Sequence, residues 1–178
     1  MNYFIQFLTY FRILIAPLIF LFITFFDFYV WALILFILAS ISDYWDGFLA
    51  RKYKLESVTG AILDPIADKI LVTFLILAFS IEFSSIFIGF TGGLIILREF
   101  WVGALRDLNS RTGNENATKV TSLAKVKTAV QFLTFASFLM GLILGNGLIL
   151  LISNFFLFLA LVITIQTGLS YTIATFKK

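Results

Sequence analysis

The sequence predicts an all-α integral membrane protein with six transmembrane helices. Hydrophobic residues make up 61% of the 178-residue chain, and the mean hydropathy is +1.03. A soluble domain of this size rarely exceeds about half apolar composition, so most side chains must face lipid or other apolar helices. The chain also divides into apolar stretches close to the length of about 20 residues that spans a bilayer. Its basic residues collect on one side of that arrangement.

Short breaks define the predicted spans. They fall at Asp27-Phe28, at Glu82 to Ser85 and at Gly145-Asn146-Gly147, and such short connections are typical of antiparallel helix neighbours. The apolar runs are too long and unbroken for barrel strands. No internal repeat or second domain is visible, so we expect a single domain over residues 1–178. The six expected spans are residues 11–26, 30–50, 58–81, 86–106, 127–144 and 149–174.

The distribution of charge predicts the orientation. The loops on one side carry Asp27 and Glu82 and no Lys or Arg. By the positive-inside rule the other, basic side is cytoplasmic and contains both termini. Its basic residues are Arg12, Arg51, Lys52, Lys54, Arg106, Arg111, Lys119, Lys125, Lys127, Lys177 and Lys178.

Two missing residue types restrict the chemistry. The chain has no Cys, which excludes disulfides and zinc-thiolate sites, and no His, which removes the usual general base. Any catalysis must therefore use carboxylates, Lys, Tyr, hydroxyls and a metal. The N-terminus has no basic region followed by a cleavage site, so we expect the first apolar run to be a retained anchor.

Four aspartates form a polar island between two apolar runs. Asp43 and Asp46 are three residues apart, and Asp64 and Asp68 are four apart, so each pair shares a helical face. If the two helices are antiparallel neighbours, the pairs meet as a four-carboxylate cage. An ionisable side chain at membrane depth costs about 2.5–3.5 kcal/mol, and no basic residue is interleaved closely enough to neutralise all four. We therefore expect a polar cavity at the cytoplasmic side that binds one or two divalent cations, with oxygen-only ligands suited to Mg²⁺, Mn²⁺ or Ca²⁺.

Small residues and an arginine follow the same helical faces. Gly47 and Ala50 lie one turn from the first aspartate pair, and Gly60 lies one turn before Asp64. Small residues let a helix or a ligand approach closely, although ordinary helix packing explains single glycines equally well. Arg51 lies one turn beyond Gly47, where its planar donor fork could bind phosphate oxygens.

A second group of basic residues surrounds the end of the fourth span and the start of the fifth. Arg98 lies within the fourth span and needs a partner, for which Glu99 or Asp107 could serve. A positive-inside loop or a lipid-headgroup patch is the simpler interpretation for Arg111 and Lys119. A second anion pocket is the functional interpretation of the remaining cations, which are Arg98, Arg106, Lys125 and Lys127.

The aspartate region spells a recognisable motif: Asp43-x-x-Asp46-Gly47-x-x-Ala50-Arg51, eight residues, then Gly60-x-x-x-Asp64-x-x-x-Asp68. It resembles the signature of the CDP-alcohol phosphatidyltransferase family, with eight fixed residues over 26 positions and every position filled. The family has six transmembrane helices, which agrees with the predicted spans. The segments LDPIADK, REFWVGALRDL, AKVKTAVQ and LTYFRILIAP, the last with Thr9 and Arg12, are similar to members that use glycerol 3-phosphate as acceptor.

The resemblance implies a reaction and its participants. A phosphatidyl group would pass from CDP-diacylglycerol to sn-glycerol 3-phosphate, giving phosphatidylglycerol phosphate and CMP in phospholipid biosynthesis. The protein would be a homodimer in a bacterial inner membrane, among membrane lipid, with no nucleic-acid partner.

The resemblance also implies residue roles. Two Mg²⁺ or Mn²⁺ ions would be held by the four aspartates, and Asp68 would be the general base that accepts the acceptor hydroxyl's proton. The CDP-binding residues would be Asp43, Asp46, Gly47, Ala50, Arg51 and Ser57. The acceptor-phosphate-binding residues would be Arg98, Arg106, Lys125 and Lys127.

Other functions stay open at this point. A related enzyme could use inositol phosphate, serine or phosphatidylglycerol as acceptor, although the basic residues favour an acceptor with a phosphate. A divalent-cation transporter would need polar residues through the full membrane thickness, whereas the outer halves of the spans are nearly all Leu, Ile, Phe and Val. A non-catalytic assembly subunit would not need an intact set of metal and arginine positions.

Overall fold

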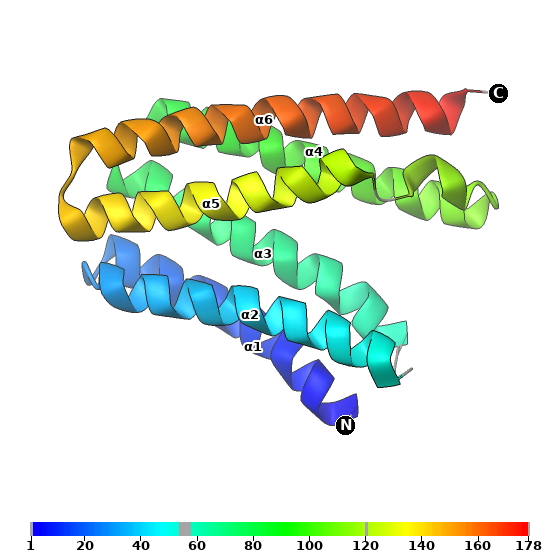
Figure 1. The fold of residues 1–178 in the computed structure, drawn as a ribbon, viewed down its shortest axis with the longest axis horizontal. Coiled ribbons are helices and arrows are strands. Elements are labelled where there is room, and N and C mark those ends of the chain that lie inside the picture. Colours follow the sequence, from blue (N-terminus) through cyan, green and yellow to red (C-terminus); the bar gives the residue numbers. More distant parts are fainter. Residues whose placement is uncertain (1, 54–57, 120, 178) are drawn as a thin grey trace. The chain divides into compact units, whose positions relative to one another are not determined.

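The computed structural model describes residues 2–53, 58–119 and 121–177, and all side chains within these ranges except those of residues 2–6, 44, 46–51, 53, 58–62 and 115. All regular structure in this part is helical, which confirms the predicted all-α class (Figure 1). The elements in chain order are α1 (Asn2–Thr24), α2 (Tyr29–Tyr53), α3 (Val58–Glu82), α4 (Ile86–Arg111), the 3₁₀ helix η1 (Glu115–Thr118), α5 (Ser122–Leu144) and α6 (Gly147–Phe176).

The helices break where the sequence predicts. Asp27 and Ser84 adopt positive φ angles of 53° and 46° between α1 and α2 and between α3 and α4. Gly145 ends α5 with a φ of 57°, a conformation that glycine adopts without steric cost, and its N–H donates to the carbonyls of Gly141 and Leu142. The Asn146 side chain then caps α6 by accepting a hydrogen bond from the backbone N–H of Leu148.

Four of the helices, α1, α4, α5 and α6, are long and apolar enough to cross a membrane. The apolar part of α2 is shorter, Tyr29–Asp43, and α3 carries Asp64 and Asp68 near its start. The prediction of six spans is therefore borne out for four helices and stays a prediction for the other two. α1 and α5 begin well before the expected spans, α1 at residue 2 rather than 11 and α5 at residue 122 rather than 127.

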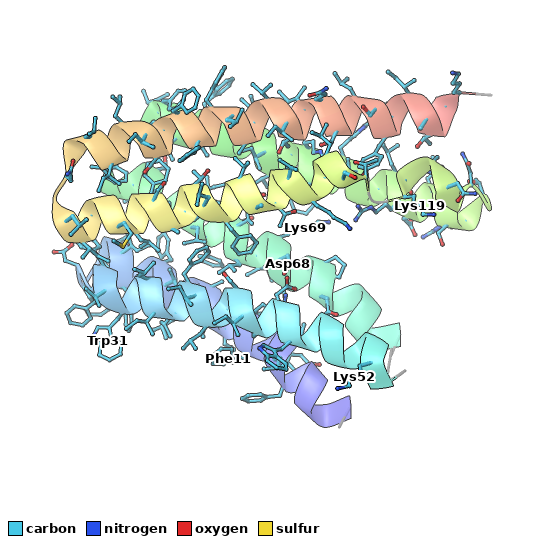
Figure 2. The ribbon with its side chains drawn as sticks, viewed as in Figure 1. Phe11, Trp31, Lys52, Asp68, Lys69 and Lys119 are labelled. Carbon is cyan, nitrogen blue, oxygen red and sulfur yellow. The ribbon has the colours of Figure 1, made fainter. Side chains whose placement is uncertain are left out.

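Large apolar side chains remain exposed on the long helices, as lipid-facing positions require. Trp31 on α2 is 59% exposed (Figure 2), and Ile86 and Phe90 on α4 are 88% and 69% exposed. In water such a surface would be unfavourable, whereas in a bilayer it contacts acyl chains. Together with the helix lengths, these faces describe a multi-pass membrane protein.

The chain forms two compact units, Met1–Ser85 and Ile86–Lys178. In the first unit α1 packs against both α2 and α3 (Figure 1). The sequence analysis considered the second and third helices as direct neighbours. In the structure both helices pack instead against α1, whose apolar face includes the buried residues Ile15 and Ile19. The Tyr29 hydroxyl donates to Glu82 at 2.6 Å and joins the start of α2 to the end of α3.

In the second unit α6 packs against both α4 and α5, and η1 contacts α4 and α6. Phe135, Phe138 and Leu157 are among the buried apolar side chains of this unit. Polar residues are buried beside them, because helices in a membrane can pair through hydrogen bonds as well as through packing. The buried polar side chains are Thr91, Arg98, Asn109, Thr118, Lys127, Gln131, Thr134, Ser153, Thr164 and Thr167.

Candidate active site

The first unit brings three of the four predicted aspartates together. Asp43 lies on α2, and Asp64 and Asp68 lie one turn apart on α3. Asp68 is on the side of α3 that faces α1 (Figure 2). Asp46 follows Asp43 by one turn of α2, and its side chain is outside the described set.

Two side chains of α1, Arg12 and Thr9, collect these carboxylates. Arg12 Nη1 donates to Asp43 Oδ1 at 2.5 Å and to Asp68 Oδ1 at 2.6 Å. Arg12 Nη2 lies 3.6 Å from Asp64 Oδ1, which also accepts a hydrogen bond from Thr9 Oγ1 at 2.6 Å. Thr9 and Arg12 are three residues apart and so share the face of α1 between α2 and α3. The carboxylates therefore converge on a single guanidinium.

Burial differs sharply between the arginine and the aspartates. The Arg12 side chain is fully buried, whereas those of Asp43, Asp64 and Asp68 are 42%, 35% and 51% exposed. The three carboxylates thus stay partly accessible, while the arginine that joins them is enclosed.

The chemistry of this group fits a divalent cation. Carboxylate oxygens are the ligands that Mg²⁺ and Mn²⁺ prefer. Arg12 supplies one positive charge that three described carboxylates share. Within the side chains that the structure describes, however, no three carboxylates form a metal cage, since the guanidinium lies at their centre. The metal cavity stays a prediction for which the donor set is suitable.

Arg12 adds a partner that the sequence analysis did not assign to the aspartates, for which it found no interleaved basic residue able to neutralise all four. The arginine is 31 positions from Asp43 and 56 from Asp68, so sequence proximity could not reveal the pairing. The sequence did indicate that Arg12 has a partner, because an arginine inside an apolar span needs a buried one. Thr9 was noted only as part of the N-terminal resemblance, and Arg12 only there and among the basic residues of the cytoplasmic side.

The remaining nucleotide-binding candidates lie at the end of α2 and just after it. The backbone of α2 carries Gly47, Ala50 and Arg51 in its last turns, with side chains outside the described set. Ser57 lies outside the described residues. Lys52, in the same turns, is exposed (Figure 2).

The second unit contains an ion network of opposite composition. Glu99 Oε1 accepts hydrogen bonds from Lys127 Nζ at 2.5 Å and from Arg98 Nη1 at 3.1 Å. Arg98 Nη2 donates to Thr167 Oγ1 at 2.5 Å. The network therefore joins α4, α5 and α6. It also decides between the two partners expected for Arg98: Glu99 fills that role, while Asp107 pairs with the exposed Arg111 at 3.0 Å.

The other two predicted acceptor residues are less enclosed. Arg106 is exposed on α4 and interacts electrostatically with both Arg98 and Tyr171. Lys125 is exposed in the first turn of α5. The structure thus brings Arg98 and Lys127 onto one carboxylate, while Arg106 interacts with Tyr171 on α6. Sequence reasoning missed that Glu99 is shared by both cations and that Thr167 takes part.

Comparison with known proteins decides the family. The family model for CDP-alcohol phosphatidyltransferase matches residues 5–166, which include every predicted site residue. The chain belongs to the CDP-alcohol phosphatidyltransferase family. Members of this family use divalent metal ions, in agreement with the oxygen-rich donor set of the first unit.

Curated relatives share one name, CDP-diacylglycerol--glycerol-3-phosphate 3-phosphatidyltransferase. The protein from Wigglesworthia glossinidia brevipalpis is 37% identical over 134 residues, 74% of this chain and 74% of the relative. The protein from Sodalis glossinidius (strain morsitans) is 35% identical over 136 residues, 74% of each chain. The protein from Blochmanniella floridana is 36% identical over 138 residues, 75% of this chain and 72% of the relative.

Proposed function

We propose that this protein transfers the phosphatidyl group of CDP-diacylglycerol to sn-glycerol 3-phosphate, giving phosphatidylglycerol phosphate and CMP. One observation carries the proposal: Asp43, Asp64 and Asp68 of the family signature meet at one point of the first unit. Relatives that carry the name of this reaction and cover about three quarters of the chain support the choice of acceptor.

The donor's diphosphate is the ligand that we assign to the first unit. Asp43, Asp46, Asp64 and Asp68 would hold one or two Mg²⁺ or Mn²⁺ ions. When bound, such ions supply positive charge that stabilises the oxygens of the CMP leaving group. Proximity along α2 supports the further assignment of the nucleotide to Gly47, Ala50, Arg51 and Ser57.

Asp68 is the residue that we assign as general base. The acceptor's hydroxyl oxygen forms a bond to the phosphorus of the phosphatidyl group, the bond from that phosphorus to CMP breaks, and Asp68 takes the hydroxyl proton. Arg12 fixes one oxygen of the Asp68 carboxylate by a 2.6 Å hydrogen bond. The side chain is half exposed, so a substrate hydroxyl can reach it.

The acceptor's phosphate is the ligand that we assign to Arg98, Arg106, Lys125 and Lys127. Arg98 and Lys127 are buried and share a single carboxylate, so their network has an excess of positive charge. A phosphate monoester carries close to two negative charges and several acceptor oxygens, which matches that excess. Serine has no phosphate and would leave the cations without their partner.

The membrane arrangement completes the proposal. The basic residues support a six-span single domain with both termini and the site at the cytoplasmic face of a bacterial inner membrane. The family supports a homodimer. Because the chain has no cysteine, single substitutions can report topology directly. A membrane-impermeant thiol reagent should label Asp27→Cys in intact cells and Lys119→Cys only after permeabilisation; the reverse pattern would overturn the orientation.

The reaction can be tested by CMP release from CDP-diacylglycerol in detergent, with Mg²⁺ or Mn²⁺ and one acceptor at a time. We expect turnover with glycerol 3-phosphate and its loss on chelation. Turnover only with inositol phosphate, serine or phosphatidylglycerol would contradict the proposed acceptor. Absence of CMP release with every acceptor, from protein that still binds metal, would contradict an enzymatic role.

A further inference from the structure

We propose that Gly168, Thr167 and Glu99 are positioning residues that fix Arg98 and Lys127 for the acceptor's phosphate, and that Gly168 thereby sets the affinity for the acceptor. The inference rests on the proposed function. It concerns residues that would act through the two cations rather than touch the substrate.

Arg98 is held at both ends of its guanidinium. Nη1 donates to Glu99 and Nη2 to Thr167 Oγ1. The Thr167 hydroxyl in turn donates to the backbone carbonyl of Ile163 at 2.9 Å, which orients its lone pairs toward the arginine. The guanidinium carbon also lies 5.9 Å from the centre of the Tyr171 ring, within the range of a cation–π contact. Three contacts from two helices leave the guanidinium little freedom.

Gly168 lets the arginine stem lie directly on α6. A Cβ at this position would be 3.0 Å from Arg98 Cγ and 3.1 Å from Nε, closer than carbon side chains normally pack. The arginine would have to shift by a few tenths of an ångström, and its two hydrogen bonds would shift with it. Gly93 on α4, in the same unit, has no atom within 4 Å of its would-be Cβ. A side chain at residue 168 would therefore displace Arg98, whereas one at residue 93 would meet nothing.

Glu99 sets the distance between the two cations. The same oxygen, Oε1, accepts from Lys127 on α5 and from Arg98 on α4. Without that shared carboxylate the two positive charges would repel each other. Because both cations donate to the same carboxylate oxygen, Arg98 and Lys127 are held close together. A phosphate can then bind both cations through different oxygens.

The test is a matched pair of substitutions, Gly168→Ala and Gly93→Ala, with full kinetics in each substrate. A displaced arginine should raise the KM for glycerol 3-phosphate by about tenfold, because small misplacements of a binding group are costly. The KM for CDP-diacylglycerol and the Mn²⁺ concentration for half-maximal rate should not change. Gly93→Ala should match the wild type in every parameter. Equal KM values in the two variants, or an equal rise in both substrates' KM, would overturn the inference.

A second pair covers the case in which Gly168→Ala does not fold. Thr167→Val keeps the shape but removes the hydroxyl, whereas Thr167→Ser keeps the hydroxyl that accepts from Arg98. We expect a raised KM for glycerol 3-phosphate in the valine variant and recovery in the serine variant. Equal KM values in both would overturn the inference while the proposed function stands. Absence of CMP release by the wild type with glycerol 3-phosphate would instead overturn the proposed function and, with it, this inference.

Discussion

The two units contain ion networks of opposite composition. In the first unit three carboxylates converge on one guanidinium, that of Arg12. In the second unit one carboxylate, that of Glu99, is shared by two cations. The hydrogen-bond chemistry is the same, so the ratio of acidic to basic groups decides which ligand completes each network. A divalent cation suits the first unit and a phosphate suits the second.

The networks also differ in how far their carboxylates are exposed. The Arg12 side chain is fully buried beneath aspartates that are 35–51% exposed. In the second unit the side chains of Arg98 and Lys127 are only 9% and 10% exposed, and that of Glu99 is 22% exposed. A metal at the proposed site could therefore reach the aspartates from outside, whereas a phosphate at the proposed acceptor site would compete with Glu99 for cations that are already paired. We expect substitutions in the second unit to change the KM for the acceptor more than the rate of the chemical step.

The largest expected effect comes from Asp68→Asn. The amide cannot take the acceptor's proton, and general-base catalysis contributes about 10²–10⁴-fold, so the rate of CMP release should fall by roughly 10³-fold. The amide carbonyl of this variant can still accept from Arg12, so the fold should persist. Asp107→Asn is the matched control, because Asp107 pairs only at the exposed surface with Arg111 in the described structure. Retention of more than a tenth of the activity in Asp68→Asn would contradict the proposed base.

The second-largest effect is expected for Lys127→Gln, which removes one of the two positive charges that share Glu99. Hydrogen bonds to charged groups contribute about 1.5–3 kcal/mol, so the KM for glycerol 3-phosphate should rise roughly 10- to 100-fold. The measurement is the KM for each substrate under saturating metal. Lys119→Gln is the control, since Lys119 is exposed near η1 (Figure 2), and it should leave both KM values unchanged. A rise confined to CDP-diacylglycerol would place Lys127 in the donor site instead.

Arg12→Gln tests the first unit through stability. Removing a buried partner leaves Asp43 and Asp68 without their counter-charge, which should cost about 1–3 kcal/mol because both carboxylates remain half exposed to solvent. Thermal unfolding in detergent measures the loss. Added Mn²⁺ should raise the Tm of the variant more than that of the wild type, because the aspartates then lack their internal cation. An equal or smaller metal-induced shift would mean that Arg12 does not share the carboxylates' charge.

The smallest effect is expected for Arg111→Gln. This arginine forms an exposed i,i+4 pair with Asp107, and exposed pairs contribute about 0.3–0.5 kcal/mol. Unfolding and kinetics should both stay close to wild type. A loss as large as that of Arg12→Gln would show that burial does not separate the two classes of ion pair.

Local features of the fold could be predicted from the sequence. Turn chemistry places the break at Gly145-Asn146, and the spacing of Asp64 and Asp68 places them on one face of α3. These follow from helical geometry within a few residues. For Arg98 the sequence left two partners open, Glu99 and Asp107, and the structure selects its chain neighbour Glu99.

Contacts between distant helices could not be predicted in this way. Periodicity gives the face of each helix but not the helix that covers it, so the position of α1 against both α2 and α3 was not foreseen. Arg12 consequently remained outside the predicted site. Lys127 and Glu99 are 28 positions apart, and Thr167 is 69 from Arg98, separations at which only packing determines the contact.

The proposal that the first unit binds the cation and the second binds the phosphate is tested most directly by two titrations. CMP release is measured against Mn²⁺ and against glycerol 3-phosphate. The proteins are the wild type, Asp64→Asn and Lys127→Gln. Asp64→Asn should raise the half-saturating Mn²⁺ concentration about tenfold or more, because it removes a charged oxygen ligand, and should leave the KM for glycerol 3-phosphate unchanged. Lys127→Gln should raise the KM for glycerol 3-phosphate and leave the half-saturating Mn²⁺ concentration unchanged. Equal shifts of both parameters in both variants would contradict the assignment of cation binding to the first unit and phosphate binding to the second.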